Sequence, residues 1–188
     1  MLFSRALSFF TVALSFGAVS QAAPAGSTDA IVKRASSADI AATLATLSSD
    51  LASPLASITS AGSSGTATLA TVQPLINEVT AALGTASDSL ASLNARRSLS
   101  LSKRQSDDDI ANTIAGIVTD ITNALDGVAT VPGVAALLPG VDLALNQVLR
   151  GLETLLAGVL NLVATLLVDV AALLRSLAFG LTLASLGL

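Results

Sequence analysis

The side chains able to perform chemistry in this chain of 188 residues are almost all carboxylates and hydroxyls. The sequence contains no Cys and no His, which excludes thiolate nucleophiles, imidazole bases and the common transition-metal sites. The only acidic cluster, Asp107, Asp108 and Asp109, lacks the spacing of a calcium loop and is typical of a helix N-terminus. Trp and Tyr are also absent, so the aromatic platforms on which sugars or bases stack are missing. We therefore predict no enzymatic activity, no cofactor and no metal ion.

The composition points to contact with apolar surroundings. Hydrophobic residues make up 52% and charged residues 12% of the chain, and the mean hydropathy is +0.76, which is too apolar for a disordered protein. The formal net charge is -4 and no glycine-rich phosphate loop is present, so nucleic acid is not an expected partner. The length allows one ordinary domain or two small modules.

The N-terminus has the layout of a secretory signal peptide. Arg5 is followed by the uncharged, mostly apolar residues 6–19 and then by small residues before Ala23, a pattern too short and wrongly flanked for a spanning helix. We predict a signal peptide over residues 1–22 and a mature chain that is secreted to the extracellular space or the cell wall.

Two dibasic pairs, Lys33-Arg34 and Lys103-Arg104, contain the only lysines of the chain. In a secreted protein such pairs are cut by subtilisin-like processing proteases, and each pair here precedes a helix-start signal. We predict a propeptide over residues 23–34. A second cut after Arg104 would divide the mature chain, and an uncut, solvated basic pair is the alternative at that site.

The sequence repeats itself with an offset of 70 residues, which also superimposes the two dibasic pairs. Residues 36–55 match residues 106–125 without a gap, and the match resumes after one deletion where residues 76–83 meet residues 145–152. So close a match over so short a window implies duplication.

Each copy is predicted to form a helical hairpin. In the second copy, apolar residues recur at i, i+4, i+7, i+11 and i+15, which makes one helix face apolar: Ile110, Ile114, Ile117, Ile121 and Leu125. Pro54 would end or bend the equivalent helix of the first copy. Residues 59–68 and the Pro-Gly pairs at Pro132 and Pro139 mark the connectors. We predict an all-α fold of two duplicated helical hairpins, with a four-helix bundle as one way to pack them.

The two copies differ in polarity. Residues 35–104 contain 23 Ser or Thr and balanced charges, whereas residues 105–188 contain 10 Ser or Thr and eight acids against two arginines, a net charge of -6. From residue 141 onward, 17 of 48 residues are Leu. We predict a Ser/Thr-rich helical unit over residues 35–104 and a Leu-rich hydrophobic helical unit over residues 105–188.

Residues 146–176 are predicted to form one long helix with a very wide apolar face. Its polar side chains, among them Asn146 and Glu153, fall in a sector of roughly 140° on a helical projection. Three interpretations stay open: a core helix covered by the other three, a surface-active or self-associating helix, and a helix that spans a membrane. The uncharged residues 154–168 are too few to span, and extension meets Asp169, so spanning ranks last.

The surface-active interpretation follows from the width of the apolar arc. Four helices of this size can hardly cover that arc together with the charge-free tail, residues 179–188. The residues expected to carry the apolar contact are Leu149, Leu152, Leu156, Leu160, Val163, Leu167, Leu174 and Leu177.

A signal peptide, a propeptide ending in Lys33-Arg34, a cysteine-free Ser/Thr-rich first half and a Leu-rich second half together resemble small secreted basidiomycete proteins of the hyphal surface and matrix. Proteins of that kind are implicated in aerial-hypha formation and attachment. The Lys-Arg-punctuated repeat is similar to fungal repellent precursors, and the Ala/Ser/Thr-rich helices are similar to fungal hydrophobic-surface-binding proteins. Hydrophobins depend on cysteines, so their assembly mechanism does not transfer to this chain.

We expect a non-catalytic structural protein of the fungal cell wall or extracellular matrix. Its expected partners are a hydrophobic interface or lipid, wall components, and other copies of itself. Two alternatives stay open: a precursor whose cut products act separately as secreted peptides or an effector, and a membrane-anchored surface protein.

Overall fold

Seven α-helices and one short 3-10 helix make up the described part of the chain, residues 37–95 and 104–188, in this computed structural model. This part contains no strand, which confirms the all-α prediction. It falls within a single unit, residues 32–188. The predicted signal peptide, residues 1–22, and the predicted propeptide, residues 23–34, lie outside the described residues.

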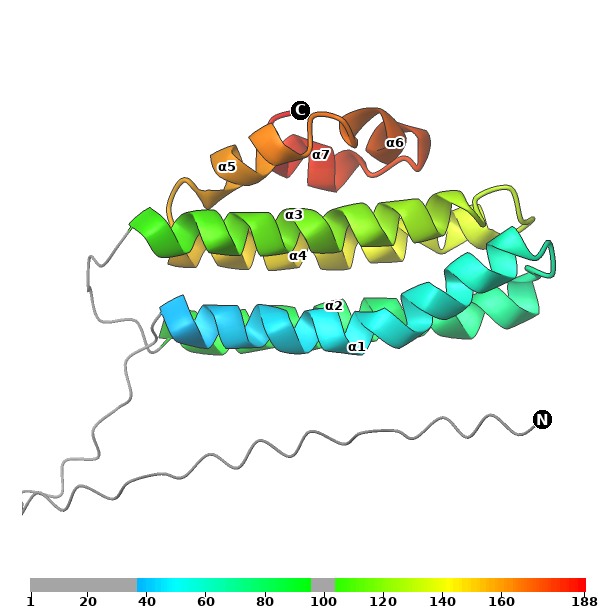
Figure 1. Cartoon of the computed structure of the whole chain (residues 1–188), viewed down its shortest axis with the longest axis horizontal. Helices are drawn as coiled ribbons and strands as arrows, with labels where there is room; N and C mark the ends of the chain where they lie inside the picture. Colours follow the sequence, from blue (N-terminus) through cyan, green and yellow to red (C-terminus); the bar gives the residue numbers. More distant parts are fainter. Residues whose placement is uncertain (1–36, 96–103) are drawn as a thin grey trace, which may run out of the picture. The chain divides into compact units, whose positions relative to one another are not determined.

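Four long helices lie side by side (Figure 1): α1 (Ser37–Ser63), α2 (Leu69–Ala95), α3 (Arg104–Asp126) and α4 (Leu138–Leu155). α1 packs against α2 and α3, and α2 packs against α4. The side between α3 and α4 is different, because no Cα atom of α3 lies within 8 Å of a Cα atom of α4. α3 and α4 therefore do not pack directly against each other.

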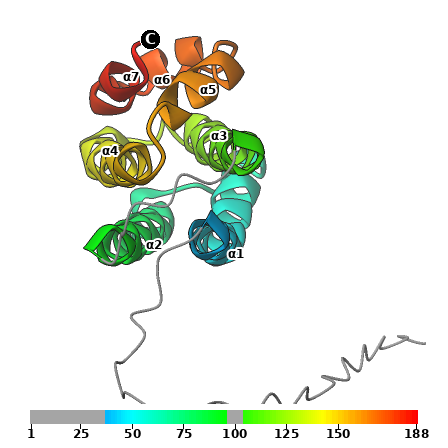
Figure 2. The same cartoon turned by 90° about the vertical axis from the view of Figure 1, so that its left-hand side faces the viewer.

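Three short helices follow α4: α5 (Val159–Leu166), α6 (Ala171–Ser176) and α7 (Gly180–Leu186). We refer to residues 159–188 as the C-terminal segment. α5 contacts α3 and α4, α6 contacts α3, and α7 contacts α4. The segment thus covers the side between α3 and α4 and forms a third layer over the four long helices (Figure 2).

The predicted apolar face of α3 is confirmed, since Ile110, Ile114, Ile117, Ile121 and Leu125 are all buried. The positions that match them in α1 are buried as well: Ile40, Leu44, Leu47, Leu51 and Leu55. A period of 3.6 residues places such side chains on one helix face, and in both helices that face lies in the core.

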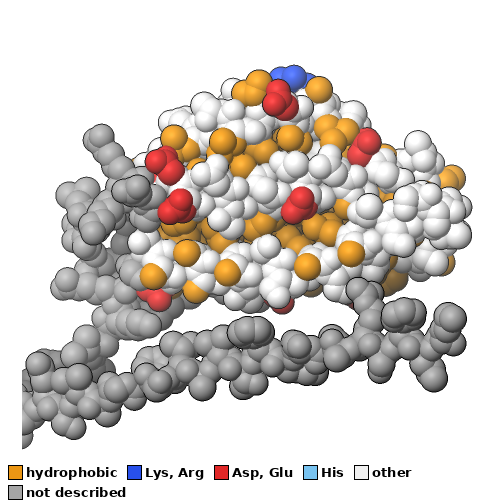
Figure 3. All heavy atoms as spheres, viewed as in Figure 1, with side chains coloured by type: hydrophobic (Ala, Val, Ile, Leu, Met, Phe, Trp, Pro, Cys, Tyr) orange, Lys and Arg blue, Asp and Glu red, His pale blue; other side chains and the backbone are white. Residues whose placement is uncertain are grey.

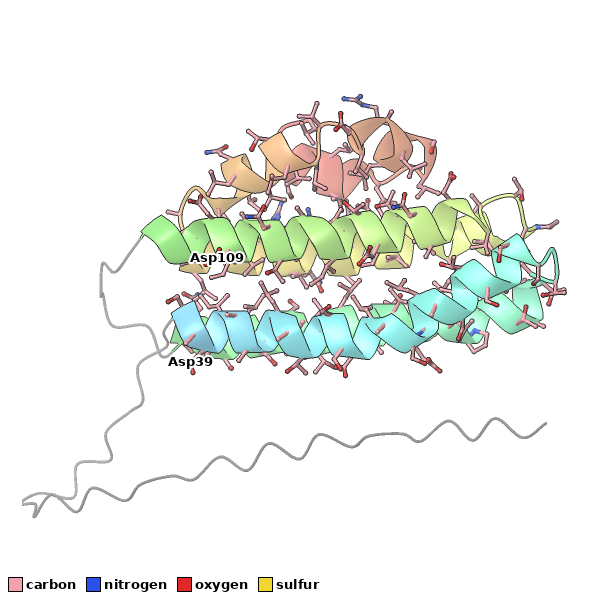
Figure 4. The ribbon with its side chains drawn as sticks, in the orientation of Figure 1. Asp39 and Asp109 are labelled. Carbon is pink, nitrogen blue, oxygen red and sulfur yellow. The ribbon has the colours of Figure 1, made fainter. Side chains whose placement is uncertain are left out.

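The two copies also share a local hydrogen bond. The Thr43 hydroxyl donates to the Asp39 carbonyl at 3.0 Å, and the Thr113 hydroxyl donates to the Asp109 carbonyl at 2.9 Å. Asp39 and Asp109 lie at the same end of α1 and α3 (Figure 4). The duplication itself remains a prediction from the sequence match, and these features are consistent with it.

Pro54 has one of its two predicted effects, a bend (Figure 1), whereas the prediction that Pro139 lies in a connector is wrong. α1 continues through the buried Pro54 to Ser63, and Figure 1 shows this helix bent, as an internal proline allows. The connector between α1 and α2 is therefore residues 64–68, which is shorter than the predicted connector of residues 59–68. Pro139 does not lie in a connector but in the first turn of α4, where a missing N–H removes no helical hydrogen bond.

The prediction of one helix over residues 146–176 is wrong. α4 ends at Leu155, and the chain leaves the helical conformation at Leu156, where φ is -134° and ψ is 86°. Gly158 then adopts a φ of 91°, a left-handed conformation that disfavours other residues. Two further turns separate α5, α6 and α7. The apolar period continues across these breaks, which is why the sequence pattern did not reveal them.

Candidate functional site: the C-terminal segment and its seat on α3 and α4

The residues expected to form an exposed apolar face are inside the folded chain. Leu156 is half-buried, and the other seven are buried: Leu149, Leu152, Leu160, Val163, Leu167, Leu174 and Leu177. The expectation that the fold cannot cover this arc is therefore corrected. The chain breaks the predicted helix, and the pieces after α4 fold back, so that α5 packs on α3 and α4 and α6 packs on α3.

Asp142 on α4 fixes the start of α7. Its Oδ2 accepts a hydrogen bond from the backbone N–H of Leu181 and its Oδ1 accepts one from Thr182, both at 2.9 Å. The Asp142 side chain is buried. Because the first N–H groups of a helix have no partner within the helix, this carboxylate acts as an N-cap supplied by another helix.

Asn146, one turn further along α4, holds the same helix by its amide. Its Nδ2 donates to the Leu181 carbonyl at 2.8 Å and also to the Ser185 hydroxyl. Next to this contact, the Thr182 hydroxyl is fully buried and has no hydrogen-bond partner within the described part of the chain. The polar contact between α4 and α7 is thus well satisfied except at one hydroxyl.

Glu153 near the end of α4 fixes the start of α5. Its Oε1 accepts a hydrogen bond from the Gly158 N–H at 2.9 Å, and its Oε2 accepts one from the Leu160 N–H at 3.2 Å. The carboxylate therefore caps α5 across the turn at residues 156–158. These two hydrogen bonds stabilise the break between α4 and α5, which the sequence pattern did not reveal.

These anchoring residues share one face of α4. Asp142, Asn146, Leu149 and Glu153 are spaced i, i+4, i+7 and i+11, the spacing of a single helix face. The helical projection of the sequence placed Asn146 and Glu153 in a polar sector and did not single out Asp142. The sequence feature that could have indicated this anchor is an acid and an amide one helical turn apart, Asp142 and Asn146, at the start of the Leu-rich region.

The α3 side of this contact is made of smaller residues. Ala111, Ala115, Val118 and Thr122 are buried and lie on the flank of α3 away from the groove that α3 shares with α1, which Asp120 and Asn123 line. The two alanines allow α5 to approach α3 closely. We call these four residues, together with Asp142, Asn146, Leu149 and Glu153, the seat of the C-terminal segment.

The positions of α1 and α2 that match the seat in sequence are not covered by the C-terminal segment, and Ser48 and Ala52 among them line the groove that α1 shares with α3. Offset by 70, the α3 residues of the seat match four exposed residues of α1: Ala41, Ala45, Ser48 and Ala52. Offset by 69, the α4 residues of the seat match Gln73, Asn77, Thr80 and Gly84 of α2, which are exposed or half-exposed. The matching positions of the two helix pairs therefore differ in exposure.

The outer surface of the C-terminal segment carries apolar side chains that the fold leaves exposed. Leu162, Leu166, Val168 and Leu181 are 37%, 46%, 61% and 47% exposed. Figure 3 shows apolar side chains reaching the surface at the top of the view, where this segment lies. The segment is thus apolar on its inner side and partly apolar on its outer side.

The remaining sequence predictions concern sites and segments of other kinds. Asp107 lies in the first turn of α3, as expected of a helix N-terminus. Of the processing residues, Lys33, Arg34 and Lys103 lie outside the described residues, and Arg104 is the first residue of α3. In the described ranges, no three acids are grouped so that they could hold a metal ion.

No helix within residues 37–95 and 104–188 has the length and apolar character needed to cross a membrane. Comparisons of the whole chain with protein-family models and with curated proteins gave no match.

Proposed function

We propose that this chain is a non-catalytic, secreted structural protein of the fungal cell wall or extracellular matrix. It acts by adsorbing at hydrophobic interfaces through the C-terminal segment, while the surface of α1 and α2 faces water or wall polysaccharide. The single observation that carries the proposal is the partly apolar outer surface that the C-terminal segment adds over α3 and α4.

The outer surface of the C-terminal segment differs in character from the exposed positions of α1 and α2. On α1 and α2 the positions that match the seat are exposed or half-exposed and consist of Ala, Ser, Gln, Asn, Thr and Gly. On α3 and α4 the seat is covered by a layer whose outer surface presents Leu162, Leu166 and Val168. A clustered apolar surface of this kind favours an interface or another copy of the protein.

The packing between the two halves of the chain also bears on the peptide-precursor alternative. A cut after Arg104 would fall at the first residue of α3. The contacts of α1 with α3 and of α2 with α4 would hold the halves together after such a cut. This supports one structural unit over fragments that act separately.

Surface tension at the air–water interface and binding to hydrophobic beads test the proposal. The variant Leu166→Asn with Val168→Asn should adsorb less than the unaltered protein, because it places two amides on the outer surface of the segment. The matched control, Ala45→Asn with Ala52→Asn, changes the exposed flank of α1 and should adsorb normally. A monomeric protein that leaves both surface tension and beads unaffected would refute the proposal.

A further inference from the structure

We propose that the C-terminal segment is a lid that leaves its seat at an apolar–water interface, so that the apolar inner side of the lid contacts the apolar phase while Asp142, Asn146 and Glu153 of the seat are hydrated. This inference rests on the proposed function, because it concerns how the same surface adsorbs. It adds a closed state in water, in which the apolar inner side of the lid is hidden against the seat, and an open state at the interface.

The lid is latched by polar contacts that water can replace. Asp142 and Glu153 accept four backbone N–H hydrogen bonds from the lid and from the turn before it, and Asn146 donates to one backbone carbonyl. Each of these bonds joins an α4 side chain to a backbone group, and ordered water bonds to such groups almost as well. Opening the lid therefore leaves no polar group without a partner.

The lid helices depend on an apolar surface for their stability. They contain 8, 6 and 7 residues, whereas isolated helices shorter than about 12–15 residues are marginal in water. Their buried side chains include Val159, Val163 and Leu174. An apolar interface offers the same kind of surface as the seat, and amphipathic helices lie in such interfaces.

The connection between α4 and the lid suits a hinge. Leu156 is already outside the helical conformation, and Gly158 has a φ of 91°. Rotation about residues 156–158 moves the lid without disturbing the hydrogen bonds within α4.

The four long helices do not need the lid for their own core. The residues that α3 shares with α1, such as Ile114 and Ile121, match Leu44 and Leu51, and all four are fully buried or nearly so. The flank that the lid covers on α3 is exposed at the matching positions of α1. Opening therefore exposes the seat, whereas the side chains packed between the four long helices stay buried.

A removable cross-link tests the lid. The Asn146 amide and the Ser185 hydroxyl are in hydrogen-bond contact, and the natural chain has no cysteine, so Asn146→Cys with Ser185→Cys should form a single disulfide between α4 and α7. The matched control is Thr68→Cys with Thr71→Cys, whose hydroxyls are 3.1 Å apart at the start of α2. Adsorption to hydrophobic beads and the fall in surface tension are measured for both pairs, oxidised and reduced.

Because adsorption through an open state scales with the population of that state, the oxidised Asn146→Cys, Ser185→Cys protein should adsorb about tenfold more slowly than after reduction. The control pair should adsorb alike in both forms. Equal adsorption of the locked and unlocked lid would overturn the lid and leave the proposed function standing. An unaltered protein that does not adsorb at all would instead refute the proposed function.

A second variant keeps the test decisive if the cysteine pair does not fold or oxidise. Asp142→Asn with Glu153→Gln removes the charges from the latch and should make adsorption faster than that of the unaltered protein. The control, Asp50→Asn with Asp88→Asn, neutralises two exposed carboxylates of α1 and α2 and should not. An unchanged rate in the loosened variant would contradict a latched lid.

Discussion

The Asp142 carboxylate on α4 accepts a hydrogen bond of 2.9 Å from the backbone N–H of Thr182, forty residues further along the chain. The neighbouring N–H of Leu181 bonds to the second oxygen of the same carboxylate. The first turn of α7 is therefore fixed by a side chain of another helix, and α7 has no side-chain cap of its own.

Removing the charge of this carboxylate should weaken the attachment of α7. Asp142→Asn keeps one acceptor oxygen but loses the second, and it should lower the free energy of unfolding by about 1–3 kcal/mol. Urea denaturation measures this loss, and hydrogen exchange should locate the increased opening in residues 159–188. Asp88→Asn, at an exposed position of α2, should stay within about 0.5 kcal/mol of the unaltered protein. Equal losses in the two variants would contradict the capping role.

Removing the buried Thr182 hydroxyl should raise the free energy of unfolding, the opposite of the effect expected for Asp142→Asn. This hydroxyl has no hydrogen-bond partner among the described residues, so Thr182→Val should raise the free energy of unfolding by about 1 kcal/mol. Thr122 is the comparison, because its buried hydroxyl donates to the Val118 carbonyl at 2.6 Å. Thr122→Val should give no such gain in thermal or urea unfolding. A destabilised Thr182→Val protein would mean that this hydroxyl has a partner in solution.

Gly158 should not tolerate a side chain even though space is available. An added Cβ would meet no atom within 4 Å, but φ is 91°, so Gly158→Ala should destabilise the protein by about 1 kcal/mol through backbone strain. Gly116 lies in the interior of α3 with equal space and an ordinary φ. Gly116→Ala should stabilise by about 0.5–1 kcal/mol. Thermal denaturation of the two variants should therefore shift in opposite directions.

Gly62 marks a close approach of two backbones. A Cβ at this position would lie 2.8 Å from the carbonyl oxygen of Gly127, so Gly62→Ala should destabilise by about 1–3 kcal/mol despite the better helix propensity of alanine. A Cβ added at Gly84 in α2 would meet no atom within 4 Å, and Gly84→Ala should stabilise the helix. If calorimetry finds both variants stabilised, the end of α1 does not pack on the end of α3 as described.

Two leucines of α4 differ in burial and should differ in how much they contribute to stability. Leu149 is fully buried, whereas Leu143 is 50% exposed. Leu149→Ala should lower the free energy of unfolding by about 2–5 kcal/mol, and Leu143→Ala by less than about 1 kcal/mol. Chemical denaturation measures both values. Similar small losses would show that Leu149 faces solvent in the free protein, as the width of the apolar arc suggested.

The parts of the fold that the sequence predicted are those that depend on local periodicity. The apolar face of α3, from Ile110 to Leu125, follows from spacing within one helix, and the offset of 70 residues transfers it to α1. A hydropathy pattern marks which face of a helix avoids water. It does not say which other element covers that face.

The C-terminal region shows where local periodicity is not enough. The pattern assigns Leu149, Leu160 and Val163 correctly to an apolar face, but it does not give their neighbours, because α4 and α5 are separated by a turn at Gly158. That turn depends on a contact between Glu153 and backbone groups five and seven residues later. A carboxylate that caps a following helix has the same sequence signature as one that faces solvent, so only the fold distinguishes them.

The order of the elements along the chain has a consequence for biosynthesis. Translation proceeds from the amino terminus, so α3 and α4 emerge before the helices that cover them. A newly made chain therefore passes through a stage in which Leu149 and Val118, both fully buried in the folded protein, are still without the helices that cover them.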